Sequence, residues 1–216
     1  MELMYRYRSA VEALLQKVRD TQTEAMIKAG ELIADTVAGG GKIYLGGICH
    51  SIEMDLICRG GGPLFYRHLD CGIDGLNPGD LIVVSSVSGR TKSVVDLAWA
   101  AMEKGVKVIA FTSMEYAVQV DPVHESGKKL YEFVTHVLDN CAPAAEAMIE
   151  VEGIEARFAA ASGIASDYIM WNVTAVAVEK LMERGITPGI YKSANFPGGA
   201  DYNNNVLTPN FEKYGW

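Results

Sequence analysis

Five short apolar runs are spaced along the chain with helix-like segments between them, and this alternation constrains the fold more than any other feature. The runs are residues 42–47, 64–69, 81–87, 106–112 and 133–138. Each run is apolar almost throughout, which is typical of strands that are covered on both faces. Strands that alternate with helices form right-handed crossover units around a parallel sheet. We therefore expect an α/β fold, a three-layer αβα sandwich with a five-stranded parallel sheet.

Three segments show the apolar spacing of helices. Residues 8–38 predict a long amphipathic helix at the N-terminus, either as one helix or as two in series. The glycines at positions 39–41 end this segment, as glycines commonly do at helix C-termini. Residues 93–104 and about 166–184 predict two further helices. We expect the helices to cover both faces of the sheet.

The last part of the chain differs in character. Residues 193–216 are rich in turn-forming types, which predicts an irregular C-terminal tail. The tail nevertheless keeps Phe211, Tyr214 and Trp216, and a disordered segment usually carries fewer aromatic residues. We therefore expect it to pack on the rest of the chain or on a second subunit. The total length of 216 residues fits a single domain, of which residues 1–40 are the N-terminal helical segment.

Composition narrows the range of partners. The 19 Lys and Arg residues against 27 Asp and Glu give a net charge of −8, which argues against a nucleic-acid-binding surface. No apolar run approaches the roughly 20 residues that span a bilayer, and the first residues lack the order of a signal peptide, so we expect a cytoplasmic protein and no membrane partner. The partner is then a small molecule or another protein.

The cysteine and histidine residues predict no metal site. The four cysteines form no C-x-x-C pair, and we interpret Cys58 and Cys71 as small buried hydrophobes. His68 fits a strand residue, and His124 and His136 are interpreted as structural, because no carboxylate or cysteine lies at metal-ligand spacing from them. We expect neither a metal nor another cofactor.

The apolar run 81–87 passes directly into a cluster of hydroxyl groups, after which a helix begins. The hydroxyls belong to Ser85, Ser86, Ser88 and Thr91. The start of a helix binds phosphate because its first N–H groups are unpaired and its dipole is positive there. Gly89 allows the backbone to approach an anion closely. The same residues also fit an ordinary helix N-cap, but the number of hydroxyls favours an anion site.

A second polar cluster follows the first predicted strand. In open parallel sheets, ligands bind beyond the carboxyl ends of the strands where the strand order reverses. If the two strands are neighbours, Ser51 and the Ser86 loop converge on one phosphate, although Ser51 also fits an N-cap. His50 and Glu53 are the candidate acid and base, with Asp55 as the alternative carboxylate. A helix-dipole role for Glu53 and a backbone-bonded loop role for His50 stay open.

Taken in order, these segments resemble the SIS (sugar isomerase) domain superfamily. The similarity is greatest to a single-domain bacterial branch of phosphosugar-binding proteins related to phosphoheptose isomerase. The segments that carry it are His50-Ser51, residues 84–90 (VSSVSGR), 107–113 (KVIAFTS), 126–132 (SGKKLYE), 139–140 (DN) and 181–188 (LMERGITP). The resemblance covers most of the chain.

The resemblance implies a flavodoxin-like five-stranded sheet, a homodimer or homotetramer, and a bound phosphosugar. The residues implied to hold it are Ser51, Ser86, Ser88 and Thr91. In the related isomerases a glutamate abstracts the proton next to the carbonyl, through an enediol, and a histidine assists. Glu53 and His50 are the nearest residues for these roles. The last helix often supplies a polar group, here Asn172, which fits a buried amide bonded to backbone equally well.

Three functions remain open from the sequence. The first is an aldose–ketose isomerase that acts on a sugar phosphate. The second is a non-catalytic phosphosugar sensor, which the lack of a preceding DNA-binding helix-turn-helix disfavours. The third is a lyase or etherase that acts on an amino-sugar phosphate.

Overall fold

The structure, a computed structural model, describes residues 1–46 and 52–216. Its helices are α1 (Glu2–Ala38), α2 (Ile52–Leu56), α3 (Lys92–Glu103), α4 (Met114–Ala117), α5 (Ser162–Glu183), α6 (Gly199–Tyr202) and α7 (Thr208–Tyr214). Its strands are β1 (Ile43–Leu45), β2 (Tyr66–His68), β3 (Leu81–Ser85), β4 (Lys107–Thr112), β5 (His136–Asp139), β6 (Ala147–Val151) and β7 (Ile154–Ala160). Short 3₁₀ turns cover Ile73–Gly75 and Leu130–Glu132, and a π turn covers Asn203–Leu207.

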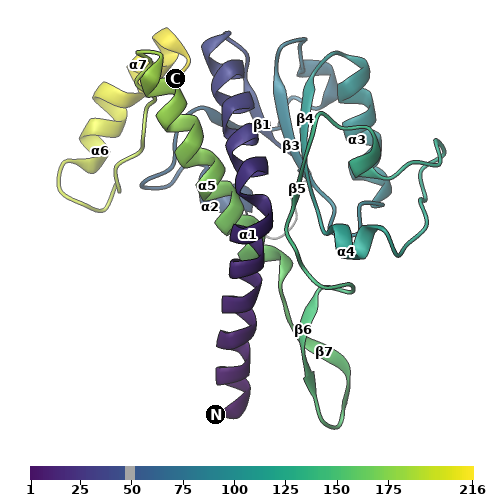
Figure 1. The fold of residues 1–216 in the computed structure, drawn as a ribbon. Helices are drawn as coiled ribbons and strands as arrows, with labels where there is room; N and C mark the ends of the chain where they lie inside the picture. The colour runs from purple at the N-terminus through teal and green to yellow at the C-terminus, as the bar shows by residue number, and fades with distance from the viewer. Residues whose placement is uncertain (47–51) are drawn as a thin grey trace.

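Strands β1 to β5 form one sheet in the order β2-β1-β3-β4-β5, and every neighbouring pair is parallel (Figure 1). Each strand lies inside one of the five apolar runs of the sequence. The predicted α/β class with a five-stranded parallel sheet is therefore confirmed. This order is that of the flavodoxin-like doubly wound folds.

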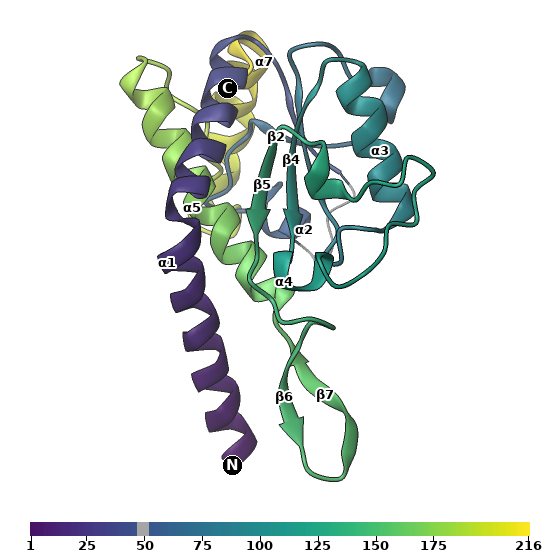
Figure 2. The same cartoon turned by 45° about the vertical axis from the view of Figure 1, so that its right-hand side comes forward.

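Helices cover the sheet on both faces, as Figures 1 and 2 show. Along β3, Leu81 and Val83 face a core that also contains buried residues of α1, α2 and α5. Ile82 and Val84 face a second core, which contains the buried residues of α3. All five side chains of β3 are buried, because strand side chains alternate between two covered faces.

Helix α1 is a single helix of 37 residues, which decides between the two predicted alternatives. It packs along α5 at a close approach around Gly30, where a Cβ atom would lie 2.6 Å from Val176 Cβ and 2.8 Å from the carbonyl oxygen of Val173. The imidazole of His136 lies 2.8 Å from the carbonyl oxygen of Ala25, so it links β5 to α1. Burial lowers the pKa of His136. The structural role predicted for His136 fits these contacts.

The sequence gives no expectation for the antiparallel hairpin of β6 and β7. Its two-residue turn consists of Glu152 and Gly153, of which only Gly153, at the second central position, has a positive φ (80°), as in a type II turn. Figure 2 shows the hairpin projecting beyond the carboxyl ends of β4 and β5, beside the first turns of α1.

The segment 193–216 differs from the expected irregular tail, because it contains α6, a π turn and α7. It packs on its own chain, as one of the two alternatives predicted. The Arg67 guanidinium lies 4.8 Å from the centre of the Phe211 ring, and Trp216 packs against the core on the α1 side. The prediction that Cys58 and Cys71 are buried is wrong, since both are exposed at loops.

The close approach of α1 and α5 predicts that Gly30→Ala destabilises the fold. Helix propensity alone would favour alanine by about 1 kcal/mol. The added methyl group would overlap Val176, and overpacking costs about 1–3 kcal/mol. We expect the free energy of unfolding to fall by about 1 kcal/mol in urea denaturation. Glu31→Ala, at the exposed neighbouring position, serves as the control and should be neutral; a stabilised Gly30→Ala variant would contradict the packing.

Candidate functional site

The crossover connections leave the sheet in opposite directions at β1 and β3. The chain passes from β1 to α2 on the face covered by α1 and α5, and from β3 to α3 on the other face. Because β1 and β3 are neighbours, the strand order reverses between them, and in such sheets ligands usually bind at the carboxyl edge near this reversal point. Residues 47–51 follow β1 and lie outside the described residues, and with them the predicted site residues His50 and Ser51.

The hydroxyl loop after β3 is held by bonds within itself. The buried Ser86 donates from Oγ to Thr91 Oγ1 at 2.9 Å and accepts from the Thr91 backbone N–H at 3.2 Å. The Gly89 backbone N–H donates to the Ser86 carbonyl at 2.8 Å. Ser86 therefore fixes the loop directly before α3. The N-cap alternative is not confirmed, because Thr91, the N-cap residue of α3, makes no side-chain cap hydrogen bond.

The other residues of this loop differ in whether a hydroxyl group is available to bind a ligand. Ser85 is buried at the end of β3, on the side of the sheet that faces α2 and α5. Gly89 has a φ of 67°, and a Cβ there would lie 3.2 Å from both Thr112 Oγ1 and Ala117 Cβ, so glycine is required. Ser88 is half-buried, and within the described part of the chain no hydrogen bond engages its hydroxyl. Ser88 and the exposed Thr91, whose hydroxyl oxygen accepts from Ser86 and keeps its own proton to donate, are thus the hydroxyls of this loop that are available to a ligand.

Glu53 lies in the first turn of α2 and is hydrogen-bonded through Oε1 to His68 Nδ1. His68 is the last residue of β2 and is in register with Leu45, the last residue of β1. The pair therefore stands at the carboxyl edge of the sheet, at the ends of β1 and β2. Sequence analysis placed His68 in a strand but missed this contact, because nothing local in the sequence links positions 53 and 68.

Asp55, the alternative carboxylate, is engaged elsewhere. Its Oδ2 accepts a hydrogen bond from Trp171 Nε1 at 2.7 Å, and it forms an ion pair with Arg59. These contacts join α2 to α5. Glu53 is consequently the better placed of the two carboxylates to meet a ligand.

Helix α5 brings two further polar residues toward this region. Asp167 lies one turn before Trp171, and its Oδ1 is the buried side-chain oxygen that lacks a hydrogen bond among residues 1–46 and 52–216. Burial raises the pKa of the Asp167 carboxyl, and the charge of Arg59 offsets part of that rise. Sequence analysis missed Asp167. Asn172 donates to the carbonyl oxygen of Tyr168 at 2.7 Å, which fits the backbone-bonded alternative.

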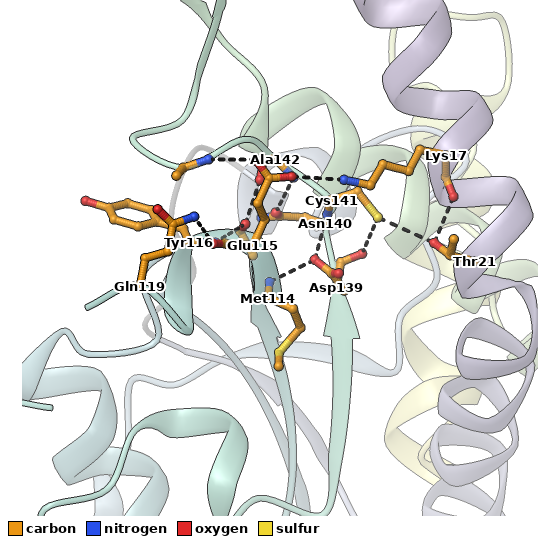
Figure 3. A network of polar contacts seen from close by, with 12 residues as sticks. Lys17, Thr21, Met114, Glu115, Tyr116, Gln119, Asp139, Asn140, Cys141 and Ala142 are labelled. Carbon is orange, nitrogen blue, oxygen red and sulfur yellow. Dashed lines mark hydrogen bonds and ion pairs between the residues drawn. The ribbon is translucent and has the colours of Figure 1, made fainter. Parts of the chain in front are cut away.

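At β4 and β5, the carboxyl edge is closed by internal polar contacts (Figure 3). Asp139 Oδ1 accepts from the backbone N–H groups of Met114 at 3.0 Å and Cys141 at 2.8 Å. Lys17 of α1 and Glu115 of α4 form an ion pair at 3.1 Å, and this bond lowers the pKa of Glu115. These groups already have partners, so the edge at β1 and β3 is the better ligand position.

Neither a metal-binding cluster nor a membrane-spanning helix is found in the described part of the chain. No group of three or more His, Cys, Asp or Glu residues there is arranged to hold a metal ion. Helix α1 has sufficient length to cross a bilayer, but among the described helices none combines that length with the necessary hydropathy.

Comparison with known sequences identifies the family. The sequence profile of the SIS domain matches residues 6–68 and 72–113, which include β1, β2, β3, α3 and β4. A UPF0309 protein of Streptomyces griseus subsp. griseus is 34% identical and covers 92% of this chain and 91% of its own length. The chain belongs to the SIS domain family.

Solved structures share the fold of this SIS domain. Phosphoheptose isomerase of Neisseria gonorrhoeae superposes with a TM-score of 0.58 at 16% identity, over 83% of this chain and 97% of its own. The NanR protein of Vibrio vulnificus, complexed with ManNAc-6P, superposes with a TM-score of 0.53 at 14% identity, over 85% of this chain and 63% of its own. At these identities the likeness establishes the fold.

Substitutions of Ser86 and Ser88 should differ in their effect on the free energy of unfolding. Ser86→Ala removes two hydrogen bonds at a buried position and should lower the free energy of unfolding by about 1–3 kcal/mol. Ser88→Ala should change it by less than about 0.5 kcal/mol. Urea denaturation of both variants checks this. Equal losses in the two variants would mean that Ser88 is also part of the internal framework.

Asp167→Asn should stabilise this SIS domain at neutral pH. The pKa of Asp167 is raised in the folded state above its ordinary value of 3.8, so ionisation costs stability above the folded-state pKa and costs nothing below 3.8. We expect a gain of about 1 kcal/mol at pH 7, or roughly 2–4 °C in Tm, that shrinks as the pH falls toward 4. Thermal melts of the variant against Asp70→Asn, an exposed control, test this. A gain that persists at pH 4 would contradict the assignment.

Proposed function

We propose that this SIS domain binds a phosphosugar at the carboxyl edge of β1 and β3 and interconverts its aldose and ketose forms. The observation that carries the proposal is the position of Glu53. Its carboxylate is half-buried, engaged by His68, and located at the same sheet edge as the start of α3. A carboxylate beside an anion-binding helix terminus is the arrangement that proton abstraction from a phosphorylated sugar needs.

In this proposal the loop after β3 anchors the phosphate. The first N–H groups of α3 and the positive end of its dipole attract the dianion, and Ser88 donates from its hydroxyl. Gly89 keeps the backbone close enough for direct contact. Ser86 and Thr91 contribute by holding the loop in shape, and Ser85 supports the end of β3. Phosphate binding supplies energy remote from the reacting carbons and fixes them against the base.

Glu53 then acts as the general base. It removes the proton from the carbon next to the carbonyl, and the carbonyl oxygen gains a proton from an acid, which gives an enediol. Glu53 returns its proton to the former carbonyl carbon while the neighbouring hydroxyl loses its own, so aldose and ketose interconvert without net gain or loss of protons. His50 is the acid that the family resemblance assigns, and Asn172 a supporting polar group.

The fold neighbours support a sugar-phosphate ligand. One is a phosphoheptose isomerase and another is complexed with ManNAc-6P. We propose that this chain acts as a single-domain cytoplasmic protein, as a homodimer or homotetramer. Binding without catalysis, as in a sensor, is the second candidate, because one of these two neighbours is complexed with a sugar phosphate and is not named as an isomerase.

Solvent isotope exchange distinguishes the candidates. The protein is incubated with phosphorylated aldoses and ketoses in deuterated water, and deuterium at the carbon beside the carbonyl is followed by NMR. We expect exchange that falls by a factor of 10² or more in Glu53→Gln, with phosphosugar binding retained. Asp55→Asn is the matched carboxylate control: its amide oxygen can still accept from Trp171 Nε1 and hold α2, so it should keep most of the activity. Binding without exchange in the wild type would favour the sensor, and carbon–oxygen cleavage the lyase or etherase.

The Ser88 hydroxyl gives a separate test of anchoring. Ser88→Ala removes one donor to the phosphate, so it should weaken a phosphosugar about tenfold and leave the affinity for the unphosphorylated sugar unchanged. Calorimetric titration of both ligands measures the two effects. Equal weakening of both ligands would contradict the proposed phosphate contact.

A further inference from the structure

We propose that His68 is a positioning residue that sets the orientation of the Glu53 carboxylate toward the substrate. This inference rests on the proposed isomerase function and goes beyond it, because it assigns a role to a residue outside the hydroxyl loop and outside α2.

The two residues reach each other from elements of very different rigidity. Helix α2 has only five residues, and the Glu53 side chain is 30% exposed. His68 ends a strand that is paired to β1 and is therefore fixed to the sheet. A glutamate has three rotatable side-chain bonds, so on a short helix it adopts several orientations unless a contact selects one. The bond to His68 supplies that contact.

The bond also divides the functions of the two carboxylate oxygens. Nδ1 of His68 engages Oε1 of Glu53, and among the described residues no other group is hydrogen-bonded to this carboxylate. Oε2 is left to receive the substrate proton. Because a misplacement of about 1 Å in a reacting group can cost on the order of 10² in rate, a fixed carboxylate matters to turnover more than to binding.

An ordinary surface ion pair is the competing explanation. Such pairs contribute little to stability, and their loss has no specific effect on a reaction. The two explanations therefore differ in what removal of the imidazole does to the rate at saturating substrate.

Substitutions at position 68 separate them. His68→Ala should lower the exchange rate at saturating phosphosugar by about 10- to 100-fold, with the Kd changed less than threefold. His68→Asn places an N–H donor close to the position of Nδ1 and should recover to within about fivefold of the wild-type rate. Met54→Ala, at an exposed neighbouring position of α2, is the control and should exchange at the wild-type rate.

The contact itself is tested without substrate. We expect a protected downfield Nδ1–H proton of His68 in the NMR spectrum of the wild-type protein and its loss in Glu53→Ala. If that proton is present and no phosphosugar exchanges deuterium, the isomerase assignment fails while the pairing stands. Absence of the proton, a wild-type rate in His68→Ala, or an Asn variant as slow as the Ala variant would each overturn the positioning role.

Discussion

The chain leaves two neighbouring strands, β1 and β3, toward opposite faces of the sheet, and this divergence determines where a ligand can bind. From β1 the chain turns toward α1 and α5, and from β3 it turns toward α3 on the opposite face. Right-handed crossovers require this when the strand order reverses between neighbours. The reversal point at the carboxyl edge is therefore a consequence of strand order and does not depend on particular side chains. The side chains decide only what it binds.

In the hydroxyl cluster after β3, some side chains hold the loop in shape and others remain available to a ligand. The Ser86 hydroxyl is used internally, between the two polar atoms of Thr91. A loop fixed in this way presents its backbone N–H groups in a constant arrangement, which suits an anion better than mobile hydroxyls would. Some of the hydroxyl groups from which the sequence predicts a phosphate site therefore hold the loop in shape instead.

The sequence predicted the sheet well because its signals are local. Five apolar runs mark five strands, and Gly105 ends the segment predicted as α3. The helices of residues 199–214 were missed because that segment is rich in turn-forming residues. The hairpin of β6 and β7 was missed although its strands, AMIEV and IEARFAA, flank the turn at Glu152 and Gly153. The candidate site was predicted less fully. Contacts such as that of Glu53 with His68 join residues that lie far apart in sequence, and only the parallel register of β1 and β2 brings them together.

The contrast between the two carboxylates of α2 follows from helical geometry. Residues two apart on a helix point about 200° away from each other. Glu53 and Asp55 therefore cannot serve the same surface: one meets His68 at the end of β2, and the other meets Trp171 on α5. Asp55 anchors the short helix to α5, and that anchorage keeps Glu53 beside His68 at the carboxyl edge of the sheet. A pair of acids that looked interchangeable in the sequence is thus divided by the fold into one that holds α2 to α5 and one that meets the end of β2.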